Sequence, residues 1–143
     1  FLHLLFNDLV RFIGDDFSPV RPELCKEYPT NYCISQQING EFSIRTYIDM
    51  PESTCIAFAS RYVDEEFHSF DEYVQSSLED FLNLHNGLFN VNMSNEQGLE
   101  LQLDVPNVVT DELVTFEHEA YMLPIVYSFG TIHFIFELIH NEL

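Results

Sequence analysis

Residues 69–92, SFDEYVQSSLEDFLNLHNGLFNVN, hold the pattern that decides the fold. Apolar residues recur there at intervals of three and four, which is the period of an α-helix with one buried face. Ser69 followed three residues later by Glu72 predicts a capping box at the start, and we expect the helix to end near Val91. The predicted inward residues are Val74, Leu78, Phe81, Leu82, His85, Leu88 and Phe89.

The other side of this helix carries polar residues at the same spacing. Ser76, Asp80, Asn83, Gly87 and Asn90 fall in one stripe, with Asp80 and Asn83 side by side. Gly87 would leave bare backbone that a partner can approach closely. Glycine inside a helix costs up to about 1 kcal/mol relative to alanine, so its presence calls for a reason. Periodicity alone leaves two interpretations open, a binding surface or an ordinary solvated face with a kink at Gly87.

The residues before the long helix predict two shorter helices and a hairpin. Residues 2–13 follow a helical period until Gly14. Three prolines in 15–31 favour irregular backbone or an edge strand. Asn39-Gly40 is a strong hairpin signal. A two-residue loop would pair Ile38 with Glu41, so we expect a bulge or a longer loop that aligns the apolar faces better.

A second helix is expected to begin at Pro51 and Glu52 and to run to about Tyr62. Its inward residues would be Cys55, Phe58, Ala59 and Tyr62. After the long helix we expect a turn at 95–98, a strand at 99–105 with one wet face, and strands near 115–128 and 131–139 joined by a tight turn. This order predicts an α+β domain with three helices and a mainly antiparallel sheet of about six strands.

Composition excludes several classes of function. The 143 residues suit a single domain, 1–143, although a chain that opens on Phe1 is also compatible with a fragment of a longer one. With 24 acidic and 5 basic residues the net charge is −19, which argues against nucleic acid and anionic membrane surfaces as partners. No apolar run approaches the ~20 residues of a membrane helix, and no signal peptide is evident. A cytoplasmic protein is expected.

Cysteine and histidine give no metal or disulfide signal. The three cysteines, Cys25, Cys33 and Cys55, are odd in number and lack C-x-x-C spacing, so we expect reduced thiols. On a strand, His118 would point away from Glu117 and Glu119. The motifs of phosphate-binding loops and nucleophile elbows are missing.

The block from Phe42 to Gly87 resembles the CheX branch of the CheC/CheX chemotaxis phosphatases. Members share a strand followed by a Pro-led helix, an acidic loop, and a long helix bearing E-x-x-N with a glycine four residues after the asparagine. A glycine turn and L-P-x-V-V follow. The matching features here are Pro51, Asp80-Phe81-Leu82-Asn83, Gly87, Gly98 and Val105-Pro106-Asn107-Val108-Val109. The resemblance covers residues 41–109 best and extends over 110–139.

The resemblance implies a phosphorylated response-regulator receiver of the CheY type as partner and hydrolysis of its aspartyl phosphate as reaction. Asn83 would orient the attacking water, and Asp80 would pair with the receiver's lysine. Ser76, Gly87 and Asn90 would contact the partner. The receiver would supply Mg²⁺, and this chain would bind no cofactor. A neutral amide suits this chemistry, because phosphoryl transfer depends on positioning and the amide does not repel phosphate.

Asp80 departs from the family, which has glutamate at this position. Glu79 cannot replace it, because it lies about 100° around the helix. The second motif of CheC-type proteins is missing, since Leu4 stands where Asn7 would need an acidic partner. A non-catalytic signalling, interaction or dimerisation module is therefore a second interpretation, and a small-ligand domain with aromatics around a pocket is a third. Family dimers use edge strands, and the apolar segment 132–139 is either such an edge or a buried strand.

Overall fold

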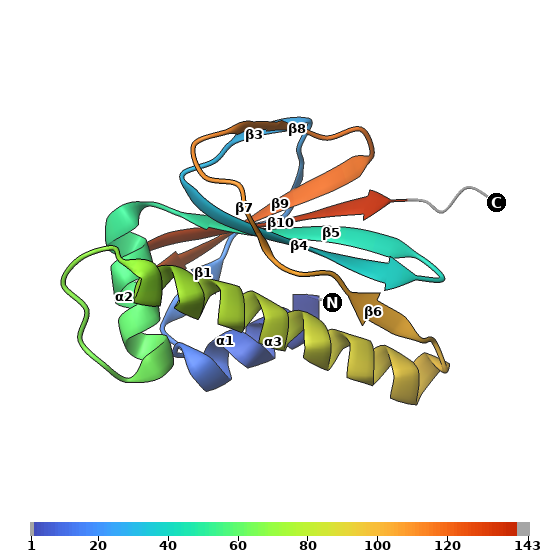
Figure 1. The fold of residues 1–143 in the computed structure, drawn as a ribbon, viewed down its shortest axis with the longest axis horizontal. Helices are drawn as coiled ribbons and strands as arrows, with labels where there is room; N and C mark the ends of the chain where they lie inside the picture. Colours follow the sequence, from blue (N-terminus) through green and yellow to red (C-terminus); the bar gives the residue numbers. More distant parts are fainter. Residues whose placement is uncertain (1, 140–143) are drawn as a thin grey trace.

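The computed structural model describes residues 2–139. It shows an antiparallel sheet with helices on one face (Figure 1). Helices α1 (Leu2–Phe12) and α3 (Glu72–Gln97) lie along this face, and α2 (Glu52–Val63) stands at one end of the sheet. The strands are β1 (Phe17–Pro19), β2 (Glu23–Leu24), β3 (Glu27–Pro29), β4 (Tyr32–Gly40), β5 (Ser43–Met50), β6 (Leu101–Leu103), β7 (Asn107–Val108), β8 (Leu113–Thr115), β9 (Glu119–Tyr127) and β10 (Gly130–Ile139). The predicted α+β class is confirmed.

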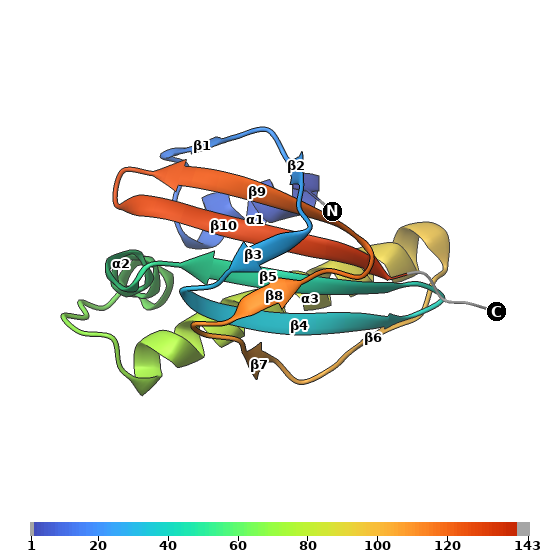
Figure 2. The ribbon, with the colours of Figure 1, turned by 90° about the horizontal axis from the view of Figure 1, so that it is seen from above.

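The sheet is built around the long central strands. Its order is β1-β9-β10-β5-β4-β6, with β2 also pairing β9 and β7 also pairing β4. The separate pair β3–β8 lies over the face opposite the helices (Figure 2). Because β10 lies between β9 and β5, the apolar segment 132–139 is a buried central strand and not a free edge.

The expectation that the first hairpin has a bulge or a loop longer than two residues is confirmed. Ile38 pairs with Ile44, and Ile34 pairs with Ile48, so the loop is longer than the two residues Asn39-Gly40. This register puts the isoleucines of both strands on the helix-covered face, where they are buried. A slip of one residue would turn them to the other face.

The main core lies between the helices and the sheet. From α3 it takes Val74, Leu78, Phe81 and Leu82, and from α2 it takes Cys55, Phe58 and Ala59. A buried polar contact also joins α1 to α3, because Asp8 Oδ2 lies 2.8 Å from His85 Nδ1. The predicted inward faces of both helices are therefore largely correct.

The predicted ends of α3 are wrong at both sides. Asp71, and not Ser69, caps its start, because the Asp71 carboxylate accepts hydrogen bonds from the backbone N–H groups of Tyr73 and Val74. The helix then continues past Val91 to Gln97 and ends at Gly98, which has a left-handed φ of +67°. Residues 92–97 are nearly all polar, so no apolar period marked this extension.

Several strands are shorter than predicted or were not predicted. The expected strand 99–105 is only Leu101–Leu103, and Val105 is exposed. Strands β1, β2, β3, β7 and β8 have two or three residues each, too few to show an alternating pattern. Within the described residues the three cysteines are free thiols, and no helix is long and apolar enough to cross a membrane.

Candidate functional site

The sequence-predicted pair Asp80 and Asn83 lies exposed on α3. The two residues between them, Phe81 and Leu82, are fully buried in the core. Because the intervening side chains are packed, the backbone that carries Asp80 and Asn83 is fixed relative to the sheet. Ser76 is also exposed, one helical turn before Asp80.

Asp80 is held from the side of α2. The Tyr62 hydroxyl donates a hydrogen bond of 2.6 Å to Asp80 Oδ2. The Tyr62 ring packs edge-on against Phe81 and Phe12, which fixes the hydroxyl in place. Burial and the bond to the Asp80 carboxylate raise the pKa of Tyr62 above its ordinary value, so the hydroxyl stays protonated and acts as donor. Among the described residues, Asp80 Oδ1 accepts no hydrogen bond.

Asp80 also borders a groove between α2 and α3. This groove has a volume of ≈ 370 Å³ and is lined by Tyr62, Val63, Glu65, Phe67, Tyr73, Ser76, Ser77 and Asp80. Ser76 and Asp80 stand on the same groove wall, as two members of the predicted stripe. A partner side chain that enters the groove therefore meets the Asp80 carboxylate.

Asn83 is held from beneath by the sheet. Gln36 of β4 is fully buried, and its Nε2 donates a hydrogen bond of 2.8 Å to Asn83 Oδ1. The sequence analysis missed Gln36. The signal that would have found it is the strand period, because Gln36 shares a face with Ile34 and Ile38 and is thus a polar residue at an inward position.

The remaining members of the stripe are less open. Gly87 is half-buried, and a Cβ atom built there would lie 4.0 Å from Leu103 Cδ1 of β6. Asn90 is half-buried too, and its Oδ1 is shielded from solvent. The structure therefore groups Ser76, Asp80 and Asn83 on an open surface and sets Gly87 beside strand β6. Partner contact by Gly87 and Asn90 stays a prediction.

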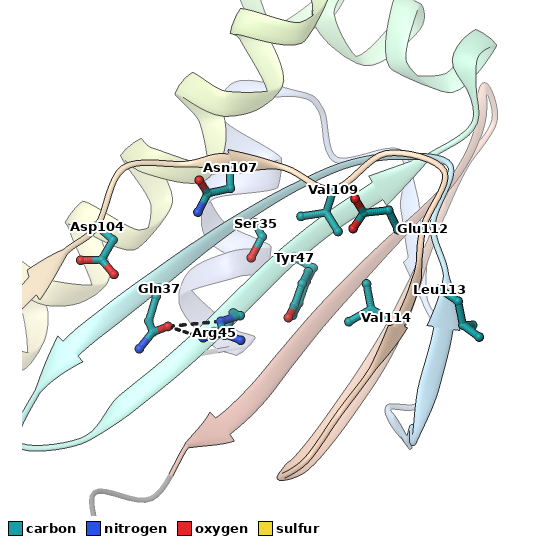
Figure 3. A pocket seen from close by; sticks show the side chains of 10 residues that line it. All are labelled: Ser35, Gln37, Arg45, Tyr47, Asp104, Asn107, Val109, Glu112, Leu113 and Val114. Carbon is teal, nitrogen blue, oxygen red and sulfur yellow. Dashed lines mark hydrogen bonds between the residues drawn. The ribbon is translucent and has the colours of Figure 1, made fainter.

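A second pocket lies on the opposite face of the sheet, under the segment that carries β7 and β8 (Figure 3). Its volume is ≈ 350 Å³, and Tyr47 is the one aromatic residue among those that line it. Arg45 donates from Nε and Nη2 to Gln37 Oε1 at 3.2 and 2.6 Å, and its Nη1 lies 4.0 Å from Glu137 Oε1. The cation of this pocket is thus already engaged by groups of the same chain.

Residues 2–139 contain no cluster of three or more His, Cys, Asp or Glu side chains placed to hold a metal ion. His118, for example, lies beside a single carboxylate, with Nδ1 3.5 Å from Glu137 Oε2.

Comparison with known proteins decides the family. The model of the family described as chemotaxis phosphatase CheX matches residues 32–130. This chain belongs to the CheX family. The resemblance seen in the sequence is thereby confirmed, and the match begins nine residues before the stretch in which the motifs were strongest. No curated protein matches the sequence.

Solved structures show the same fold. A CheC-like superfamily protein from Shewanella sp. PV-4 superposes with a TM-score of 0.80 at 19% identity, over 96% of this chain and 93% of that one. A chain of the CheX–CheY–BeF3–Mg²⁺ complex from Borrelia burgdorferi gives a TM-score of 0.83 at 18% identity, over 97% and 95%. CheX from Desulfovibrio desulfuricans gives 0.80 at 15% identity, over 96% and 95%.

Proposed function

We propose that this CheX-family domain docks on a phosphorylated receiver domain of the CheY type and hydrolyses its aspartyl phosphate. Asn83 orients the attacking water, and Asp80 anchors the receiver's lysine. The observation that carries the proposal is the exposed pair itself, in which each side chain is held by a separate framework residue. Family membership supports the partner, since one structural relative forms a complex with CheY. A cytoplasmic location follows from such a partner.

The chemistry asks little of this chain beyond placement. Water attacks phosphorus, the bond from phosphorus to the aspartyl oxygen breaks, and the receiver's carboxylate leaves with the electron pair. The water proton passes to the released phosphate or to solvent. Asn83 holds the water in line, and the receiver supplies Mg²⁺. A neutral amide and one carboxylate are sufficient for these roles, and this chain needs no cofactor of its own.

The shorter Asp80 is supported by Tyr62. An aspartate reaches less far than the family's glutamate, but the Tyr62 hydrogen bond fixes Oδ2 and leaves Oδ1 open to a lysine. A carboxylate that is already oriented loses less conformational entropy on docking. The hydrogen bond from Tyr62 therefore offsets part of the binding energy that is lost because Asp80 is shorter than glutamate.

Phosphate release from an acetyl-phosphate-charged receiver with Mg²⁺ tests the proposal. The protein is expected to accelerate release, and Asn83→Ala to remove the acceleration, a loss on the order of 100-fold. Asn92→Ala is the matched control, because Asn92 is an exposed asparagine further along α3. Equal acceleration by Asn83→Ala and the unaltered protein would overturn the catalytic role.

A second candidate function is docking without hydrolysis, favoured by the aspartate in place of glutamate. Titration of the protein with a BeF3-bound receiver measures docking separately from turnover. Tight binding with an unchanged rate of phosphate release would establish this non-catalytic module. Binding and acceleration together would establish the phosphatase.

Self-association through edge strands is also proposed. The described sheet ends in β1 and β6, and each has three residues. Such short edges offer few unpaired backbone groups, so we expect a weak dimer at most. Sedimentation across a range of concentrations measures it, and a tight dimer would contradict this expectation.

A further inference from the structure

Asn83 rests on a network of buried polar side chains. Gln36, Thr46 and Asn86 are each 0% exposed. Gln36 Nε2 donates to Asn83 Oδ1 at 2.8 Å and to the backbone carbonyl of Asp104 at 2.9 Å. Asn86 Nδ2 donates to Gln36 Oε1 and to Thr46 Oγ1, both at 2.9 Å. The Thr46 hydroxyl in turn donates to the backbone carbonyl of Gln36 at 2.9 Å.

This network determines which end of each amide points where. A backbone carbonyl only accepts, so the group of Gln36 that faces the Asp104 oxygen must be the NH2 group. The same NH2 group faces Asn83, and Asn83 must therefore present its oxygen to it. The exchange of oxygen and nitrogen in Gln36 would set two acceptors against each other, both at Asp104 and at Asn83. Asn83 is thus held with its carbonyl oxygen inward and its NH2 group toward solvent.

We propose that Gln36 is a positioning residue that fixes the side-chain amide of Asn83 with its NH2 group facing the docked receiver. This inference rests on the proposed function for its catalytic consequence. The outward NH2 group donates to the oxygen of the attacking water, whose other lone pair then faces phosphorus. Donation from Gln36 into Oδ1 also polarises the amide and strengthens its NH2 group as a donor.

The benefit of Gln36 is preorganisation. The terminal torsion of an asparagine is broad, so an unsupported Asn83 would sample both amide orientations and many angles. A hydrogen bond from a fully buried donor removes that freedom before the receiver docks. The gain appears in turnover more than in affinity, because the angle of the amide matters most when water attacks.

Gln36→Met tests the role, since methionine keeps the length of the side chain and removes the donor. We expect kcat to fall about tenfold, the loss of roughly one hydrogen bond, with KM for the phosphorylated receiver nearly unchanged. Thr46→Val is the matched control, because it removes a hydroxyl from the same network without removing the bond to Asn83. Both variants should lower Tm, and only Gln36→Met should lower kcat. An equal fall in kcat in both variants would overturn positioning and leave a structural role only.

A measurement independent of activity separates this inference from the proposed function. In ¹⁵N-labelled protein, relaxation of the Asn83 side-chain NH2 should report a rigid amide, and Gln36→Met should make it mobile. Equal mobility in both proteins would overturn the positioning role whatever the catalytic result. A rigid amide that becomes mobile supports positioning even if the receiver's phosphate is released no faster, a result that would overturn the phosphatase proposal alone.

Discussion

The two faces of the sheet each carry a polar cluster, and the clusters differ in how their hydrogen bonds are used. On the helix face, Tyr62 and Gln36 donate hydrogen bonds to Asp80 and Asn83, and both of these residues are exposed. On the opposite face, Arg45 donates two hydrogen bonds to Gln37 (Figure 3). Its Nη1 also lies 4.0 Å from Glu137 Oε1. The cluster on the helix face orients two exposed side chains. In the cluster on the opposite face, the hydrogen bonds join the side chains of the cluster to one another.

This contrast explains why we place the function on the helix face, although both faces are hollowed to a similar volume. A recognition group is effective when it is oriented by its own protein and still has an unused donor or acceptor. Asp80 and Asn83 meet both conditions. Arg45 meets them less fully, because Gln37 already accepts from two of its N–H groups and the Glu137 carboxylate lies beside its remaining nitrogen. The chain has 24 acidic residues and a net charge of −19, and Asp80 is the one acidic residue to which the proposed mechanism gives a role.

The strongest test of the contrast is Asp80→Ala. Removal of one partner from a charge pair at an interface costs at least about 2 kcal/mol, so the Kd for a BeF3-bound receiver should rise about 30-fold. Glu96→Ala removes an exposed negative charge near the far end of α3 and should change the Kd less than twofold, about the scatter of an exposed charge. Calorimetric titration measures both. Equal effects would mean that overall charge, and not the position of Asp80, governs docking.

Asp80→Glu sharpens the same point with a smaller effect. The family residue adds one methylene and reaches further toward the receiver's lysine, so kcat/KM for phosphate release should rise about fivefold, the value of roughly 1 kcal/mol. Asn83→Ala combined with Asp80→Glu should show no gain, because the water would still lack its anchor. No gain in the single variant would show that the reach of Asp80 does not limit the reaction.

Local periodicity accounts for what was predictable from the sequence. The inward face of α3, the exposure of Asp80 and the longer loop of the first hairpin follow from patterns of a few residues. The supports of the site do not follow, because Tyr62 is 18 residues from Asp80 and Gln36 is 47 residues from Asn83. Such contacts exist only once helix and sheet have packed. The α3 cap was missed for a different reason, since Ser69 and Asp71 are both good capping residues and the fold selects the latter.

Tyr62→Phe tests whether the hydrogen bond from the Tyr62 hydroxyl to the Asp80 carboxylate contributes to receiver binding. The ring keeps its packing, and only the hydroxyl that orients Asp80 is lost. An oriented carboxylate gains about 0.7 kcal/mol from one neutral donor, so the Kd for the receiver should rise about threefold. Tyr73→Phe is the control, because Tyr73 lines the same groove and makes no hydrogen bond to Asp80. Tighter binding by Tyr62→Phe would show that the hydroxyl competes with the receiver's lysine.

The smallest effect is expected on the other face. Arg45→Met removes the cation of the Figure 3 pocket and keeps an unbranched side chain, so Tm should fall modestly as Gln37 and Glu137 each lose one partner. Docking and phosphate release should stay within about twofold of the unaltered protein, because Arg45 lies across the sheet from Asp80. A rise in the Kd for the receiver as large as that of Asp80→Ala would show that the receiver docks at the Arg45 pocket, on the face opposite the helices.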